Sequence, residues 1–177
     1  MILIEHNFTI FIGRNVEEHY NNVIAVLKRV RDFGFKCKMS KCNFFMDEVN
    51  YLGYSISKLG KRANFERVKA ITNLAVPSSV KMVESFIGKV NYYSKFIPNF
   101  SELSAPLNQL RHKNVQFKWS SQCQEAFDKL KSHLIKKPLL VHFDNNLPVI
   151  LNTDASDYGI GAVILHRFPD GSEHPIA

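Results

Sequence analysis

Residues 80–97 read Val-Lys-Met-Val-Glu-Ser-Phe-Ile-Gly-Lys-Val-Asn-Tyr-Tyr-Ser-Lys-Phe-Ile, and Pro98 follows them. Apolar residues recur in this stretch at intervals of three and four, the spacing of one face of an α-helix. Ser78 or Ser79 can cap the helix, and a proline ends it because it lacks the backbone N–H. The spacing predicts a helix to about Ile97, whose core face consists of Val83, Phe86, Val90, Tyr93 and Ile97.

The opposite face of this predicted helix is polar and contains a glycine. On a continuous helix, a wedge of roughly 80° holds five side chains, given the rotation per residue: Lys81, Glu84, Gly88, Tyr92 and Lys95. A glycine inside a helix costs about 1 kcal/mol relative to alanine, and close approach of another backbone is the usual reason for one. Two groups could approach Gly88 this closely. One is a nucleic-acid backbone or minor groove, and the other is a second helix of the same chain.

Further patterns on both sides of this helix predict an α+β fold. Asn15 and Glu18 have capping-box spacing before a helical run that Gly34 ends, and Trp119-Ser120 opens a helix with Cys123, Phe127, Leu130 and Leu134 on one face. Two shorter helices are predicted from Asn64 to Pro77 and from Ser101 to about Leu110. Strands are predicted at 35–39, at 43–46 and 49–57 (joined by a turn at Asp47-Glu48), at 147–153 and 159–165, and from Glu173 after the turn at Asp170-Gly171.

The net charge of +7 favours an anionic partner, and it is unevenly distributed. Residues 1–118 contain 18 Lys and Arg against 9 Asp and Glu, whereas residues 119–177 contain 5 against 7. The first part is therefore the candidate for phosphate binding.

Three cysteines, the absence of a secretory signal and the absence of a long apolar run predict an intracellular protein, cytoplasmic or nuclear, without a membrane partner. Cys37 and Cys42 have no second Cys pair and no His at zinc-finger spacing. They are expected to be thiols and not zinc ligands.

Several stretches in order resemble the Pol polyprotein of gypsy-type long-terminal-repeat retrotransposons. They include Tyr51-Leu-Gly-Tyr54 within residues 49–57, the stretch 85–101 and Ala105-Pro-Leu107. Downstream they continue with Phe117-Lys-Trp119, residues 123–130 and residues 152–163. The resemblance extends over about residues 10–177.

The resemblance implies four segments. Residues 1–60 are similar to the end of a reverse transcriptase palm with its primer-grip hairpin, and 61–118 to the helical thumb. Residues 119–138 are similar to the connecting helix, and 139–177 to the first antiparallel strands of a ribonuclease H-like α/β domain, truncated at its third strand. An apolar sheet that begins so late is expected to be the least protected part in hydrogen exchange.

The resemblance also implies binding residues for a primer–template duplex, either an RNA–DNA hybrid or DNA. They are Tyr51, Leu52, Gly53 and Tyr54 in the hairpin and Glu84, Gly88 and Tyr92 in the thumb, beside Lys81, Lys89 and Lys95 on the same helix. Asp154 stands where the family has its first ribonuclease H metal ligand. Phe8-Thr9 stands where the family has the paired polymerase aspartates.

Both reactions of such an enzyme, RNA-directed DNA polymerase (a transferase) and ribonuclease H (an endonuclease), use paired divalent metals held by several carboxylates. Mg²⁺ is expected in the parent enzyme but not to be held stably here, because one carboxylate rarely binds it well. The sequence therefore predicts a nucleic-acid-binding fragment without a complete active site. The alternatives are a portion of a longer active polymerase and ribonuclease H, joined to the rest of the Pol polyprotein, or a domesticated protein-interaction remnant.

Overall fold

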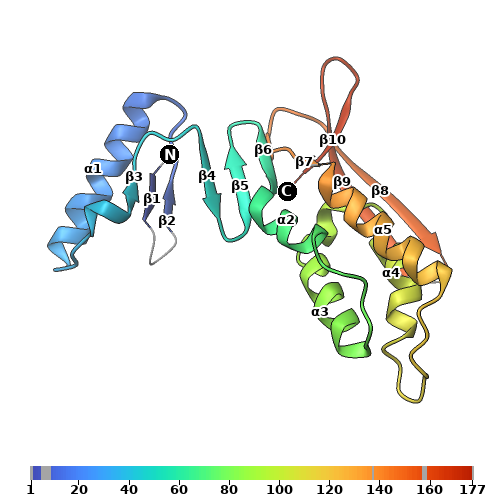
Figure 1. Cartoon of the computed structure of the whole chain (residues 1–177). Helices are drawn as coiled ribbons and strands as arrows, with labels where there is room; N and C mark the ends of the chain where they lie inside the picture. Colours follow the sequence, from blue (N-terminus) through green and yellow to red (C-terminus); the bar gives the residue numbers. More distant parts are fainter. Residues whose placement is uncertain (1, 5–8, 137, 157–158, 177) are drawn as a thin grey trace. The chain divides into compact units, whose positions relative to one another are not determined.

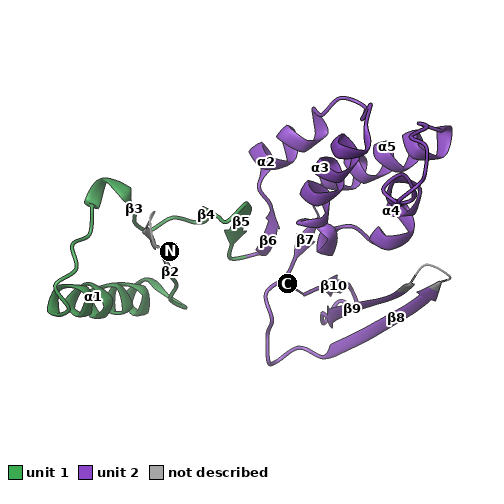
Figure 2. Cartoon of the chain, turned by 90° about the horizontal axis from the view of Figure 1, so that it is seen from below, with its two compact units in different colours: residues 1–58 green, residues 59–177 purple. Residues whose placement is uncertain are grey.

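The computed structural model describes every residue except 1, 5–8, 137, 157–158 and 177 (Figure 1). The chain divides into two units, residues 1–58 and residues 59–177 (Figure 2). The described residues form α-helices and antiparallel strands, so the predicted α+β class is confirmed. The finer division into four segments stays a prediction.

The first unit combines one long helix with short strands. Strands β1 (Ile2–Ile4), β2 (Thr9–Phe11) and β3 (Cys42–Asn43) form an antiparallel sheet in the order β2-β1-β3. Helix α1 (Val16–Asp32) and the 3₁₀ turn η1 (Met39–Lys41) lie between β2 and β3 in the chain. Strands β4 (Glu48–Tyr51) and β5 (Tyr54–Ser57) follow as a hairpin.

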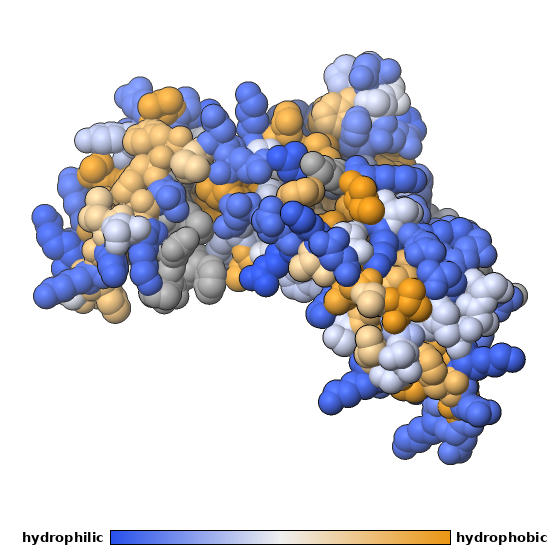
Figure 3. Space-filling view, in the orientation of Figure 1, coloured by the Kyte–Doolittle hydropathy of each residue, from blue (hydrophilic) through white to orange (hydrophobic). Residues whose placement is uncertain are grey.

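Helix α1 begins and ends where the sequence predicts. The Asn15 side chain accepts a hydrogen bond from the Glu18 backbone N–H at 2.8 Å, and Gly34 takes a φ of +76° after the last turn. Burial is sparser than the periodicity implies, because Val16 is 73% and Tyr20 54% exposed, whereas Val23 is buried. Figure 3 shows hydrophobic side chains at the surface around α1.

The expected strands at 43–46 and 49–57 are wrong in their limits. Beyond Asn43 the first of them is irregular, and the second folds back on itself at Leu52-Gly53 instead of pairing across Asp47-Glu48. Leu52 and Gly53 both have positive φ, 45° and 77°, the geometry of the two-residue turn that best matches strand twist. This turn sets Tyr51 opposite Tyr54.

The second unit starts with β6 (Gly60–Ala63), which pairs with β7 (Leu139–Leu140). Between them in the chain lie the helical elements: α2 (Phe65–Thr72), α3 (Val80–Asn91), η2 (Ser94–Phe96), α4 (Phe100–Gln109) and α5 (Ser121–Ile135). The expected helix at 80–97 is therefore too long. After Asn91 the chain tightens into three-residue hydrogen bonds, Tyr93 N–H to Val90 O and Phe96 N–H to Tyr93 O.

The helices of this unit share one core. The Phe86 and Phe127 ring centroids lie 4.6 Å apart, and the residues predicted to face inward on α3 and α5 are all buried. Lys131 adds a polar contact, since its Nζ donates to the Leu74 carbonyl at 2.6 Å and lies 4.0 Å from the Phe127 ring centroid. The helix that the periodicity of residues 119–138 predicts is confirmed as α5.

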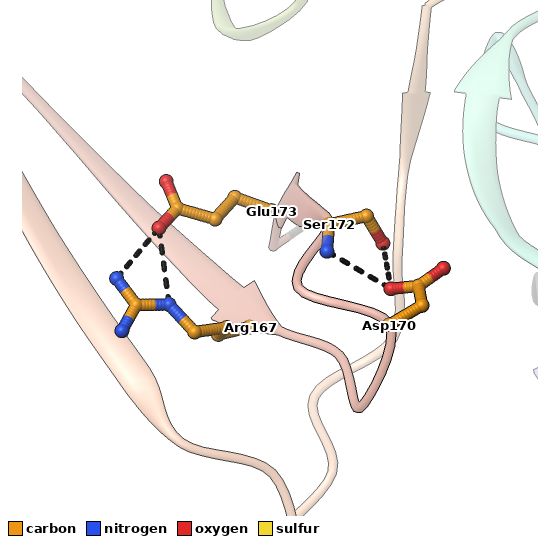
Figure 4. Close-up of polar contacts among 4 residues, drawn as sticks. All are labelled: Arg167, Asp170, Ser172 and Glu173. Carbon is orange, nitrogen blue, oxygen red and sulfur yellow. Dashed lines mark hydrogen bonds and ion pairs between the residues drawn. The ribbon is translucent and has the colours of Figure 1, made fainter.

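The last strands form a separate antiparallel sheet of β8 (Val149–Ser156), β9 (Gly159–Arg167) and β10 (Glu173–Pro175), in the order β10-β9-β8. The β9–β10 turn is held by Ser172, whose N–H and hydroxyl donate to Asp170, and by the Arg167–Glu173 ion pair at 2.8 Å (Figure 4). The Ser172 hydrogen bonds lower the pKa of the Asp170 carboxyl.

His166 on β9 is fully buried. Its Nε2 accepts from the Asp144 N–H at 2.9 Å, and its Nδ1 lies 3.1 Å from the Pro148 carbonyl oxygen. The hairpin beyond it is exposed, with Leu151 63% and Ile160 87% accessible. Among the described residues, no helix is long and apolar enough to cross a membrane.

His19 gives the first unit a testable dependence on pH. Its side chain is 5% exposed, its ring lies edge-on to Phe45, and neither ring nitrogen has a hydrogen-bond partner among the described residues. Burial lowers the pKa of His19 below the ordinary value of 6.5. The unfolded chain therefore takes up the proton before the folded chain as the pH falls. The stability that this unit has above pH 6.5 is lost progressively as the pH drops below 6.5.

We expect amides of α1 to exchange faster at pH 5.5 than at pH 7.5, after correction for intrinsic rates. In His19→Phe this difference should disappear, because the variant has no titrating group there. Equal pH dependence in both proteins would show that His19 is not the cause.

Candidate nucleic-acid interface

Helix α3 presents one face to the core and the opposite face to solvent. The Ser79 side chain caps it by accepting from the Met82 N–H at 3.4 Å. Val83 and Val90 are fully buried, whereas Tyr92, directly after the last helical residue, is 50% exposed. The side chains predicted for binding on this helix and directly after it are all exposed: Lys81, Glu84, Lys89 and Tyr92.

Gly88 lies in the middle of this exposed face, and its surroundings decide between the two explanations given for it. A Cβ atom built at Gly88 would meet no atom within 4 Å, apart from the helix's own backbone. Close packing of another described helix at this position is therefore wrong. The helix carries the cost of a glycine with no reason inside the described part of the chain.

Lys95 does not belong to the same wedge as the other four residues, because α3 ends four residues before it. It lies on η2, near enough to Lys61 of β6 for that lysine to influence its ionisation. Burial, together with Lys61, lowers the pKa of Lys95 to about 8. Sequence reasoning missed Lys61, because only the fold brings β6 to η2.

The hairpin residues Tyr51, Leu52, Gly53 and Tyr54 belong to the first unit. Leu52 at the turn is 50% exposed, whereas Tyr54 is 8% exposed and contributes to the core. The hairpin therefore presents its turn to solvent, and only part of the predicted set is accessible there.

Asp154 lies on β8, opposite Gly161 of β9, with its side chain exposed. No group of three or more His, Cys, Asp or Glu residues lies close enough to hold a metal ion anywhere in the described ranges. The described carboxylates therefore do not fit a paired Mg²⁺ site. Of the pair expected at the polymerase position, Thr9 opens β2, while Phe8 lies outside the described residues.

The second unit also contains a cavity of about 1240 Å³ that the sequence did not indicate. Residues 94–102 form one side, and β8 with β9 forms another. The ionisable residues among its lining are Lys95, Glu102, His133, Lys136 and Asp154. Because these come from separate elements, no local pattern could have predicted their proximity.

Residues 119–177 match a family described as the RNase H-like domain found in reverse transcriptase. The chain is 34% identical over 164 residues to the transposon Tf2-3 polyprotein of Schizosaccharomyces pombe (strain 972 / ATCC 24843), and equally to the Tf2-4 polyprotein of that strain. These alignments cover 93% of the chain but 12% of each relative, so the chain spans about one eighth of their length.

Solved structures of foamy viral protease–reverse transcriptase are similar as well. One, a form named dRH in complex with double-stranded DNA, has a TM-score of 0.79 and 27% identity, and covers 96% of this chain and 29% of that one. Another, in complex with an RNA/DNA hybrid, has a TM-score of 0.75 and 28% identity, and covers 94% and 23%.

Gly88→Ala should stabilise the chain, because alanine is the better helix former and its methyl group meets no atom. The expected gain in the free energy of unfolding is about 1 kcal/mol or slightly less, measured by urea denaturation. Ala126→Gly in α5, whose side chain is buried, is the contrasting change and should destabilise the chain. A loss of stability in Gly88→Ala would mean that the face around Gly88 is occupied.

Proposed function

The chain belongs with the Pol polyproteins of long-terminal-repeat retrotransposons, and from this premise we propose that it binds primer–template nucleic acid through its thumb-like helices. We further propose that it holds no complete active site. The observation that carries the binding proposal is the solvent-facing surface of α3 around Gly88.

This surface suits a nucleic-acid duplex. The bare backbone at Gly88 allows a close approach, with Tyr92 beside it for contact with sugars or bases. Lys81 and Lys89 are both exposed on this helix and supply positive charge for phosphates. Charge and close approach thus occur together on one helix.

The similar structures support the choice of partner. Those foamy viral proteins are in complex with double-stranded DNA and with an RNA/DNA hybrid. At 27–28% identity over nearly the whole chain, the likeness reaches beyond the fold. A duplex of either kind is therefore the partner that we propose for this chain.

The proposed lack of catalysis rests on the carboxylates that are present to bind metal ions. Paired-metal chemistry needs several carboxylates within a few ångströms of each other, and Asp154 belongs to no group of three or more His, Cys, Asp or Glu residues among the described residues. We propose that the polymerase and ribonuclease H activities belong to a longer polypeptide, which supplies the other carboxylates needed to bind Mg²⁺. Cytoplasm or nucleus, where such templates occur, is the proposed location.

Charge reversal on α3 tests the binding proposal. In Lys81→Glu plus Lys89→Glu, affinity for a labelled RNA–DNA hybrid should fall at least tenfold in fluorescence anisotropy. The slope of log affinity against log salt should become shallower by about 0.9 for each phosphate that the variant no longer neutralises. Lys113→Glu plus Lys118→Glu, an equal charge change in the exposed loop before α5, is the matched control. If both double variants bound the hybrid equally weakly, α3 would not be the binding surface.

Asp154→Asn tests the proposed lack of a metal site. We expect the variant and the original chain to show the same weak Mg²⁺ binding by calorimetry, and neither to cleave an RNA–DNA hybrid, because one carboxylate holds Mg²⁺ poorly. Mg²⁺-dependent cleavage that disappears in Asp154→Asn would contradict this.

A further inference from the structure

We infer that Lys131 of α5 is a positioning residue for the proposed duplex-binding surface. It holds the loop of residues 73–79, which leads from α2 into α3, and thereby fixes the first turn of α3 and the position of Lys81. The inference rests on the proposed function. It adds to that function a residue of another helix, which acts on the surface without contacting the nucleic acid itself.

The loop before α3 has few hydrogen bonds of its own. The Asn73 and Leu74 N–H groups continue the last turn of α2 by donating to its carbonyl oxygens at 3.0 and 3.1 Å. Residues 75–78 then form no backbone–backbone hydrogen bond in the described part of the chain. Ordering such a segment costs conformational entropy. The loop therefore needs an attachment to another element to keep one conformation.

Lys131 supplies this attachment. Its Nζ donates a hydrogen bond to the Leu74 carbonyl oxygen at 2.6 Å, between residues that lie far apart in the sequence. Leu74 follows Asn73, the C-cap residue of α2, so the ammonium group also lies beside the negative end of that helix dipole. A hydrogen bond from a charged donor is roughly twice as strong as a neutral one. The start of the loop is thus held from α5.

The same ammonium group contacts the aromatic core that faces α3. The Lys131 Nζ lies 4.0 Å from the Phe127 ring centroid, and this ring lies 4.6 Å from that of Phe86 on α3. A cation over an aromatic face is attracted by the quadrupole of the ring. Lys131 is therefore joined to α3 in two ways. One is the loop that leads into the helix, and the other is the pair of rings that packs against it.

The surroundings of Lys131 differ from those of Lys129 on the same helix. Lys129 is exposed and pairs with Glu125 at 2.6 Å, and exposed pairs of this kind contribute little in water. Lys131 is half-buried. Burial lowers the pKa of Lys131 below the ordinary value of 10.5, while Asp128 acts in the opposite direction. Because a hydrogen bond is electrostatically stronger away from water, Lys131 is the better anchor of the two.

The first turn of α3 depends on this anchor because its own cap is weak. The Ser79 Oγ accepts from the Met82 N–H at 3.4 Å, which is longer than the usual range for such a bond. The Val83 N–H donates to the Ser79 carbonyl oxygen at 3.1 Å and closes the turn. Lys81 lies within this turn, and its side chain is exposed. Helix ends fray, so release of the loop removes the fixed position from which Lys81 meets a phosphate.

Variants of the full chain test this inference by fluorescence anisotropy with a labelled RNA–DNA hybrid. Lys131→Met should lower the affinity about fivefold, within the range for residues that act on a site without contacting its ligand. The slope of log affinity against log salt should stay unchanged, because Lys131 neutralises no phosphate. Lys131→Arg should restore the affinity, since it keeps a charged donor that stacks on an aromatic ring. Lys129→Met removes an equal charge from the same helix and should bind as the original chain does.

Hydrogen exchange measures the effect on α3 without any ligand. In Lys131→Met the amides of Met82 and Val83 should exchange faster, while that of Val90, later in the helix, should keep its protection. Ala126→Gly is the control for a general loss of stability, because it weakens α5 without touching the loop. It should leave the first turn of α3 no less protected than the rest of that helix. Lys131→Gln keeps a neutral donor and should show a smaller effect of the same kind, so the test does not depend on the folding of one variant.

The outcomes separate the inference from the proposed function. If the original chain binds the hybrid and Lys131→Met binds it as Lys129→Met does, the inference is wrong and the proposed function stands. A shallower salt slope in Lys131→Met would indicate a direct phosphate contact and would overturn the positioning role. An equal loss of affinity in Ala126→Gly, or no recovery in Lys131→Arg, would overturn it as well. If the original chain does not bind the hybrid, the proposed function fails and the inference fails with it.

Discussion

The contact between the rings of Phe86 on α3 and Phe127 on α5, whose centroids lie 4.6 Å apart, ties the inward face of α3 to the helical core of the second unit. Each of these rings is almost completely buried, and removing either from a core of this kind costs about 3–5 kcal/mol. The contact also has a directional consequence. Because it fixes which side of α3 faces inward, it fixes Gly88 and its lysine neighbours on the outside.

Residues with strong periodicity were predicted well. In α5, Cys123, Phe127 and Leu134 are all buried as their spacing indicates, because a helical period survives in any context that offers a core. The cap at Asn15 and the turn at Asp170-Gly171 were also found correctly, since both depend on neighbours a few residues away. Local chemistry of this kind is readable from the chain alone.

Features that depend on residues distant in the sequence were not predicted. The hydrophobic spacing did not predict the end of α3 at Asn91, because Phe96 and Ile97 are buried although the helix does not continue to them. The nearness of Lys61 to Lys95 had no signal in the sequence, since the two lysines are far apart along the chain. The single strand expected at 49–57 was wrong because the alternation of residues continues unbroken across a two-residue turn. Gly88 was recognised as unusual, but only the surrounding atoms could show that the space beside it is open.

The exposed hairpin of β8 and β9 has a practical consequence. On one face of these paired strands lie Val149, Leu151, Ile160 and Ile164, each more than half accessible. Within the described residues β8 is also an edge strand, so its outer backbone groups can pair with another strand. An apolar face beside an open edge is where aggregation of β-structure starts. We therefore expect the isolated chain to associate first through β8 and this apolar face, far in sequence from the lysines that make it basic.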